Sequence, residues 1–239
     1  MKNNQSGFTL IEIAIVLVII GLLLGGVLKG QELINSAKVK NLATDFRNVP
    51  VFIYGYQDRF RFLPGDDRDV IAHLAGGVAA VPCTGAPAIV ANTCDVGNGI
   101  IDGNWNATTA ASESYVFWQH VRLAGLTAGS VTTGAADYLP LNAVGGSIGI
   151  QSGTAVLARA PIVQLAAGPA IRGTYIICSP NILGRFAIQL DIQLDDGNTA
   201  TGSMMATPTL NYAIGGVTNI ATPTANIDPA TIYTVCMGV

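Results

Sequence analysis

Residues 8–28 read FTLIEIAIVLVIIGLLLGGVL, and this apolar stretch decides the architecture of the chain. Its only ionisable side chain is Glu12. At a rise of about 1.5 Å per residue, a helix over the stretch is about 31 Å long, which matches the hydrocarbon core of a bilayer. A cleavable secretory signal is the alternative, but such signals have a shorter apolar region followed by a small-residue cleavage site. Because KGQE (29–32) follows instead, we expect a retained membrane-spanning helix.

The composition of the whole chain excludes a disordered protein and a dedicated nucleic-acid binder. Of its 239 residues, 50% are hydrophobic and only 11% are charged, whereas a typical soluble domain has about 25% charged residues. Such a chain has enough apolar side chains to form a core. The 12 Lys and Arg against 15 Asp and Glu give a net charge of -3. The chain therefore offers no basic field to nucleic acid.

Glu12 needs a physical explanation, because a carboxylate in a membrane span costs up to about 2.5 to 3.5 kcal/mol on insertion scales. Either it reaches water at the headgroups or is protonated, or it has a cationic partner. The residues before it favour a partner. A short polar leader with Lys2 precedes Gly7-Phe8-Thr9-Leu10-Ile11-Glu12, and an unbroken apolar run follows. This arrangement resembles the prepilin signal of type IV pilins and of the pseudopilins of type II secretion systems.

The resemblance implies a processing site, a modification and a role for Glu12. In these proteins a prepilin peptidase cleaves after the glycine and the new N-terminal residue is methylated. The cut is thereby placed between Gly7 and Phe8, and the methyl group on Phe8. The ammonium created at Phe8 can then neutralise Glu12 of a neighbouring subunit during filament assembly. The implied partners are other pilin or pseudopilin subunits, the peptidase, the inner-membrane assembly machinery and the lipid bilayer.

The resemblance also implies an α+β fold, in which a long N-terminal helix carries a pilin-like globular head with a small antiparallel sheet. We expect a prepilin leader over 1–7, the transmembrane half of the helix over 8–28, its amphipathic half over 29–60 and a periplasmic head over 61–239. Apolar residues spaced three and four apart support the amphipathic half: Val39, Leu42, Phe46, Val49 and Ile53.

The expected localisation is the bacterial inner membrane, with a single pass and the head in the periplasm, and later a periplasmic or surface filament. The distribution of lysines points the other way. Lys2 precedes the span, whereas Lys29, Lys38 and Lys40 follow it, and the positive-inside rule would place the head in the cytoplasm. The orientation therefore rests on the prepilin resemblance.

Local signals predict where the helices begin and end. Pro50 predicts a kink or an end of the long helix, and Pro64-Gly65-Asp66 predicts the turn that leaves it. A second helix is expected over 112–124, with Gly125 placed to cap its C-terminus. We expect a third helix over 182–195, starting at Ser179-Pro180.

Strand signals are weaker. The alternation of apolar residues over 186–194 leaves a strand open as the alternative to the third helix. The runs 174–178 and 231–236, which are rich in Thr, Val, Ile and Tyr, are typical of strands.

The four cysteines are consistent with export to an oxidising compartment. They permit three pairings. We favour Cys83 with Cys94, which closes a short local loop, and Cys178 with Cys236, which fixes the C-terminus. A zinc site is the rival interpretation, but the chain has no C-x-x-C spacing and only 2 His.

An enzyme is not expected. Residues 145–149, GGSIG, match the nucleophile-elbow pattern G-x-S-x-G around Ser147. In that hydrolase fold the histidine follows the serine in the chain. Both His73 and His120 precede Ser147, so the order of the triad fails and a flexible glycine loop is the simpler interpretation.

No cofactor is expected, apart from a weak calcium candidate at Asp95 and Asp102. These flank Gly97-Asn98-Gly99, but two carboxylates fall short of the six to eight oxygens that Ca²⁺ takes. A plain turn is therefore favoured. Three further acidic residues are expected to form a solvated turn: Asp66, Asp67 and Asp69.

These observations predict a structural subunit of a type IV pilus-like filament, processed by prepilin peptidase and assembled through its N-terminal helix. A pseudopilin of a type II secretion system is the first alternative. A membrane-anchored periplasmic binding protein that does not polymerise is the second.

Overall fold

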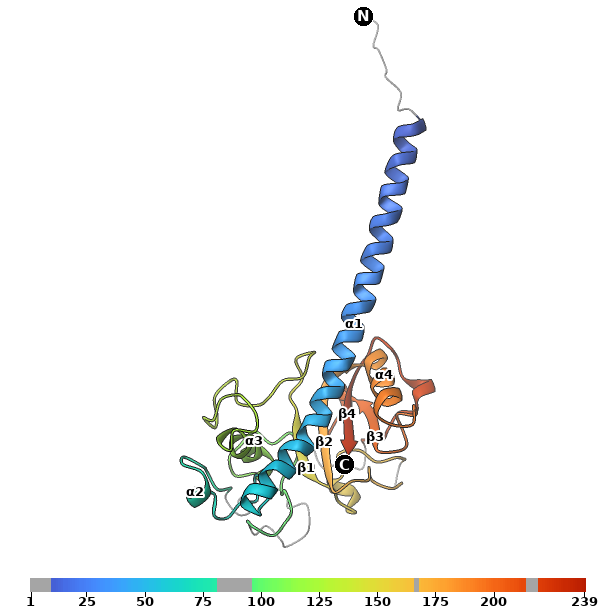
Figure 1. Ribbon diagram of the computed structural model, residues 1–239. Helices are drawn as coiled ribbons and strands as arrows, with labels where there is room; N and C mark the ends of the chain where they lie inside the picture. Colours follow the sequence, from blue (N-terminus) through green and yellow to red (C-terminus); the bar gives the residue numbers. More distant parts are fainter. Residues whose placement is uncertain (1–9, 81–95, 166–167, 214–218) are drawn as a thin grey trace, which may run out of the picture. The chain divides into compact units, whose positions relative to one another are not determined.

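The computed structural model describes residues 10–80, 96–165, 168–213 and 219–239 (Figure 1). Its contacts divide the chain into two units, residues 1–40 and 41–239. Helix α1 (Leu10–Phe60) begins in the first unit and ends in the second. The other elements follow in chain order: α2 (Val70–His73), α3 (Glu113–Leu123), β1 (Gly149–Ser152), a 3₁₀ turn (Leu157–Arg159), β2 (Tyr175–Leu183), α4 (Gly184–Leu194), β3 (Met204–Pro208), 3₁₀ turns (Thr209–Asn211 and Thr224–Asn226) and β4 (Ile232–Gly238).

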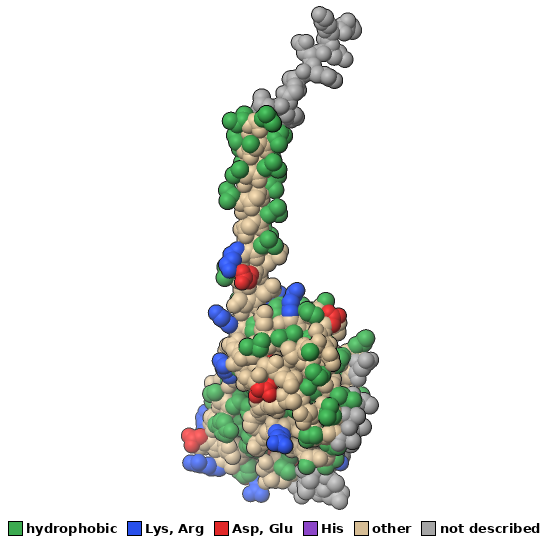
Figure 2. All heavy atoms as spheres, turned by 90° about the vertical axis from the view of Figure 1, so that its right-hand side faces the viewer, with side chains coloured by type: hydrophobic (Ala, Val, Ile, Leu, Met, Phe, Trp, Pro, Cys, Tyr) green, Lys and Arg blue, Asp and Glu red, His purple; other side chains and the backbone are tan. Residues whose placement is uncertain are grey.

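The part of α1 in the first unit is an apolar rod. Among the described residues, α1 is the one helix long and apolar enough to cross a membrane, with a mean hydropathy of 2.8 over its most apolar 18-residue window. None of the residues in that window is buried, and Figure 2 shows hydrophobic side chains along this half of the helix. Length and composition are equally compatible with a signal sequence. An apolar surface of this size marks a membrane or protein contact.

The part of α1 in the second unit is amphipathic, as predicted. Leu42, Phe46, Val49 and Ile53 are all at most 1% exposed. The helix continues through Pro50 to Phe60, so of the two outcomes predicted for Pro50, an end of the helix is wrong. Proline inside a helix costs about 3 kcal/mol, and the buried side chains on both sides of Pro50 outweigh this cost because tertiary packing supplies most helical stability.

The turn after α1 and helix α3 confirm the local signals. Arg61 and Gly65 have φ values of 62° and 94°, which is the left-handed conformation that ends a helix or forms a tight turn. Helix α3 has Ser112 as its N-cap residue, and Gly125 follows its end with φ 74°. The helix predicted over 112–124 is therefore confirmed.

The second unit contains a four-stranded antiparallel sheet in the order β1-β2-β4-β3. The two predicted strands are confirmed as β2 and β4, which lie in the centre of the sheet. The two edge strands were not predicted. Together with the helices they give the α+β fold that the sequence implied.

Helix α4 is a helix, as favoured, but its predicted start is wrong. Ser179-Pro180 lies inside β2, whose pairing with β4 shifts register between Ser179 and Ile182. Asn181 takes a left-handed φ of 64° at this irregularity. The helix itself follows β2 directly, with Leu183 as its N-cap residue. Ladder pairing thus overrides a local capping signal.

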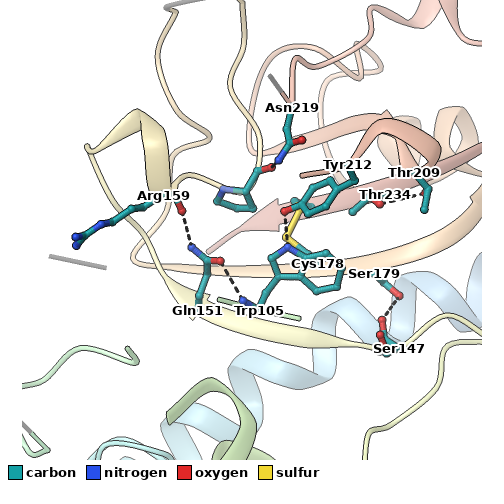
Figure 3. The surroundings of a disulfide bond; sticks show 12 residues. Trp105, Ser147, Gln151, Arg159, Cys178, Ser179, Thr209, Tyr212, Asn219 and Thr234 are labelled. Carbon is teal, nitrogen blue, oxygen red and sulfur yellow. Dashed lines mark hydrogen bonds between the residues drawn. A yellow bond between two sulfur atoms is a disulfide. The ribbon is translucent and has the colours of Figure 1, made fainter. Parts of the chain in front are cut away.

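A disulfide joins the two central strands. Cys178 of β2 and Cys236 of β4 are direct partners in the ladder and form the predicted bond. Figure 3 shows Trp105 and Tyr212 beside it, with Trp105 Nε1 donating to the Tyr212 hydroxyl at 2.5 Å. The other proposed pair, Cys83 and Cys94, lies outside the described residues.

Candidate assembly site

The residues expected to direct processing and assembly lie at the N-terminus. Gly7 and Phe8 are outside the described residues. Glu12 lies in the first turn of α1, where the positive end of the helix dipole favours a carboxylate by about 0.3 to 1 kcal/mol. Its position on the helix is exposed, as are those of Leu10 and Ile11 beside it. A carboxylate therefore projects from an otherwise apolar helix end.

The helix surface that follows Glu12 is apolar on every side. The six successive residues over 15–20 are each between 46% and 64% exposed. Since six residues complete more than one turn, they cover the full circumference of the helix. A helix that is hydrophobic all round belongs in a membrane or among other apolar helices.

Four glycines in the N-terminal half of this helix have no packing role within the described part of the chain. A Cβ atom added at Gly21, Gly25, Gly26 or Gly30 would meet no atom within 4 Å. Each glycine costs the helix about 1 kcal/mol relative to alanine. Small residues allow the backbones of neighbouring helices to approach closely in a membrane, so these positions fit packing against other helices.

The weak calcium candidate has a different environment from the one expected of a cation loop. Asp95 lies outside the described residues, and Asp102 is 7% exposed, with Asn98 Nδ2 donating to its Oδ2 at 3.3 Å. The backbone N–H groups of Gly97, Asn98 and Gly99 all donate to the Asp66 carboxylate. Successive N–H groups that converge in this way form a nest for an anion.

The prediction of a solvated turn is correct only for the exposed Asp69 and is wrong for Asp66 and Asp67. These two side chains are 1% and 0% exposed. Asp67 accepts hydrogen bonds from the Tyr56 hydroxyl at 2.7 Å and from the backbone N–H of Asp69 at 2.9 Å, and its Oδ2 lies 2.8 Å from His73 Nδ1. The two carboxylates are buried because donors from other segments satisfy them.

Glu113 adds a fourth buried carboxyl to this region, after Asp66, Asp67 and Asp102. It is 4% exposed, and its Oε2 accepts the Asp102 N–H at 2.7 Å. Burial, opposed by that hydrogen bond and reinforced by the charges of Asp66 and Asp102, raises the pKa of Glu113 to about 9. Burial also raises the pKa of Asp66 to about 6, although its three N–H donors act against the shift. At neutral pH Glu113 is therefore protonated and Asp66 is mostly ionised.

The residues of the hydrolase pattern have structural partners. The Ser147 carbonyl accepts the Ser179 hydroxyl at 2.9 Å. His120 is fully buried, with Nδ1 accepting the Gly65 N–H and Nε2 lying 2.9 Å from the Val78 carbonyl. Burial lowers the pKa of His120, so it is neutral and its Nε2 donates to Val78. His120 thus connects segments of the head.

Sequence reasoning missed the buried group of Asp66, Asp67 and Glu113. The helix predicted over 112–124 contains Glu113, and the turn predicted at Pro64-Gly65-Asp66 contains Asp66. No signal in the sequence links Asp66 with a turn 31 to 33 residues later, because that contact depends on the tertiary fold.

The comparisons with known proteins bear on the N-terminal segment. Residues 2–28 match the family model described as the prokaryotic N-terminal methylation motif. This motif is the prepilin-type signal of type IV pilins and pseudopilins. The match includes Gly7, Phe8 and Glu12 together with the apolar run. No curated protein and no solved structure matches the chain.

Proposed function

We propose that this chain, which carries a prepilin-type signal, is a structural subunit of a type IV pilus-like filament. The motif itself indicates a structural subunit that is processed by prepilin peptidase and assembles with other pilin subunits. One observation carries the proposal: directly after the motif's leader, α1 presents a carboxylate and then an apolar surface on every side.

The chain is first a membrane protein in this proposal. Residues 8–28 span the inner membrane and the head lies in the periplasm, where the Cys178–Cys236 disulfide is compatible with an oxidising environment. Prepilin peptidase cleaves between Gly7 and Phe8, and Phe8 is then methylated. Cleavage removes the polar leader and leaves a cationic amine at the end of the apolar helix.

Assembly exchanges lipid for helix–helix packing. The apolar faces of α1 remain out of water throughout, so the exchange requires no exposure of the rod. Glu12 of one subunit meets the Phe8 ammonium of the next. At about 4 Å and an effective dielectric of about 20, the attraction is roughly 4 kcal/mol before desolvation is subtracted. Since desolvation consumes much of this gain, the pair selects the axial register of the subunits more than it adds stability.

The test is Glu12→Gln, produced in the organism that makes the chain, with Glu32→Gln as the matched control. Glu32 lies on the same helix and forms an exposed ion pair with Lys29 at 2.7 Å. We expect both variants to be cleaved and methylated, as measured by mass spectrometry of the membrane fraction. We expect at least a tenfold loss of Glu12→Gln from the sheared filament fraction, and normal incorporation of Glu32→Gln.

Three results would contradict the proposal. Normal incorporation of Glu12→Gln would exclude the pairing. An uncut N-terminus, beginning with the initiator methionine, would instead indicate an anchored protein that does not polymerise. Filaments found only in the periplasm, together with a secretion defect after deletion of the chain, would favour a pseudopilin over a pilus subunit.

A further inference from the structure

Three carboxylates converge at the C-terminal end of α4 in the second unit. Asp191 lies in the last turn of the helix, and Asp195 and Asp196 follow its end. Each offers one oxygen, and these three oxygens all lie within 4.8 Å of one another. Figure 1 shows α4 beside β3 and β4, with which it is in contact.

Asp191 is the unusual member of this group. The residue is 0% exposed, and within the described part of the chain neither of its carboxylate oxygens has a hydrogen-bond partner. Leaving a buried polar group without a partner is costly, and the cost is greater for a charged group. Two other buried aspartates of the head, Asp66 and Asp67, have several donors each. The Asp191 carboxylate is therefore available to a ligand that is not a protein donor.

The other two carboxylates are held in place but retain coordinating capacity. Asp195 Oδ2 accepts the Met204 N–H at 2.7 Å. Asp196 accepts the Asn198 N–H at 2.8 Å and the Thr201 hydroxyl at 2.9 Å. A carboxylate has about four lone-pair sites, so these bonds orient both groups and leave further lone pairs for a cation.

The local charge is negative throughout. The C-terminal end of a helix carries the negative pole of its dipole, and three acidic side chains are added there. Within the described ranges, the ion pairs of the chain involve none of the three. The three carboxylates therefore repel one another at this separation when they are ionised. A bound cation would remove this repulsion.

We propose that Asp191, Asp195 and Asp196 bind a hard divalent cation, Ca²⁺ in preference to Mg²⁺. Oxygen-only ligands select hard cations. Two oxygens on opposite sides of Ca²⁺ lie about 4.6 to 5.2 Å apart at ordinary Ca–O distances, so the three oxygens fit on one coordination sphere. Free carbonyls of the last helical turn and water on the exposed side of Asp196 can complete six to eight ligands.

Magnesium fits this site less well. It demands a near-ideal octahedron at about 2.0 to 2.1 Å and retains several of its waters. A carboxylate that is fully buried, such as Asp191, is better suited to a cation that accepts irregular geometry and sheds water readily. The site is made of residues in the head and does not depend on the proposed role in filaments.

The test uses the full chain in detergent after treatment with a chelator. Isothermal titration calorimetry measures binding of CaCl₂ and of MgCl₂, and near-UV circular dichroism measures the unfolding midpoint. We expect one Ca²⁺ per chain with a Kd of about 0.1 to 1 mM. At a tenfold excess over Kd the midpoint should rise by about 3 to 6 °C. Mg²⁺ should bind at least about tenfold more weakly.

Two variants and a control connect the effect to the site. Asp191→Asn should lose Ca²⁺ binding at least about tenfold, and the exposed Asp196→Asn provides a second variant in case the first does not fold. Asp58→Asn removes an exposed carboxylate of a surface ion pair with Arg61 and should bind Ca²⁺ as the parent does. In chelator, Asp191→Asn should be at least as stable as the parent, because it removes an uncompensated charge.

Several results would overturn the proposal. These are no binding heat and no midpoint shift with CaCl₂, equal binding of Mg²⁺, or undiminished Ca²⁺ binding in both site variants. If Asp191→Asn were destabilised as much in chelator as in Ca²⁺, the role of Asp191 would be purely structural. This result would also refute the site.

Discussion

The protonated state of Glu113 makes the stability of the head dependent on pH. The unfolded chain ionises this residue near its ordinary value of 4.5, whereas the folded chain holds its proton up to about pH 9. Between these values the folded state binds more protons than the unfolded state, so stability falls as pH rises. The slope for one such group is about 1.4 kcal/mol per pH unit. Between pH 5 and 8 the loss is up to about 4 kcal/mol, an upper limit because the site can relax.

Glu113→Gln removes this dependence with little change of shape. The amide oxygen of glutamine can still accept the Asp102 N–H that Glu113 Oε2 accepts at 2.7 Å. The free energy of unfolding is measured by urea titration with tryptophan fluorescence, on the full chain in one detergent, at several pH values from 5 to 8. We expect the variant to be about as stable as the parent at pH 5 and more stable by up to about 4 kcal/mol at pH 8.

The control is Asp69→Asn, which removes an exposed carboxylate next to the buried group and should leave the slope unchanged. Asp66 also contributes to the pH dependence of the parent's stability below about pH 6, because its pKa is raised as well. Since Asp66 is present in both the parent and Glu113→Gln, it does not account for a difference between their profiles. Parallel pH profiles of the parent and Glu113→Gln would refute the reasoning, since they would show that Glu113 ionises normally in the folded protein.

Three further changes test processing and the fold. Gly7→Leu should leave the longer precursor in the membrane fraction, seen by mass spectrometry, and complete processing would contradict the assigned cut. The double variant Cys178→Ser, Cys236→Ser opens a loop with a sequence separation of 58 and should lower the free energy of unfolding by about 4 kcal/mol; a change below about 1 kcal/mol would show that the bond adds little. Gly65→Ala places a Cβ atom 2.5 Å from the Glu113 carbonyl oxygen at a φ of +94° and should cost about 2 to 5 kcal/mol. Gly134→Ala, with a φ of +86° and no atom within 4 Å of the added Cβ, should cost only about 1 to 2 kcal/mol, and equal costs would show that the contact is irrelevant.

The features that could be predicted from the sequence are those with local causes. Helix α3 has an extended Ser112 before it and Gly125 after it, and both signals lie within one turn of the helix ends. The apolar run of α1 can be recognised from the amino-acid composition of residues 8–28 alone. The prepilin-type segment is a short contiguous motif, so the match over 2–28 covers every residue expected to direct processing and assembly.

The features that could not be predicted depend on distant partners. Strand β1 is a run of four residues, all buried, without the alternation that marks a strand. Ser179-Pro180 has the local form of a helix start, yet pairing with β4 places it in a strand. The burial of Asp66 depends on donors from residues 97–99. In each case the deciding contact lies outside any window that a local pattern can cover.

Four carboxylates of this chain are removed from water, and each is stabilised in a different way. The four differ in whether the stabilising group belongs to the same chain or must come from outside it. Asp66 is satisfied by three backbone N–H groups, and Glu113 keeps its proton, so neither requires a ligand. Among the described residues Asp191 has no hydrogen-bond donor and lies beside two acidic neighbours, a combination that the proposed cation would resolve without loss of charge. Under the proposed function, Glu12 lies on a helix that is packed in a bilayer or a filament, and the cationic N-terminus of a neighbouring subunit would be its counter-charge. The internal solutions stabilise the head alone, whereas the two proposed external solutions would connect the chain to a cation and to neighbouring subunits.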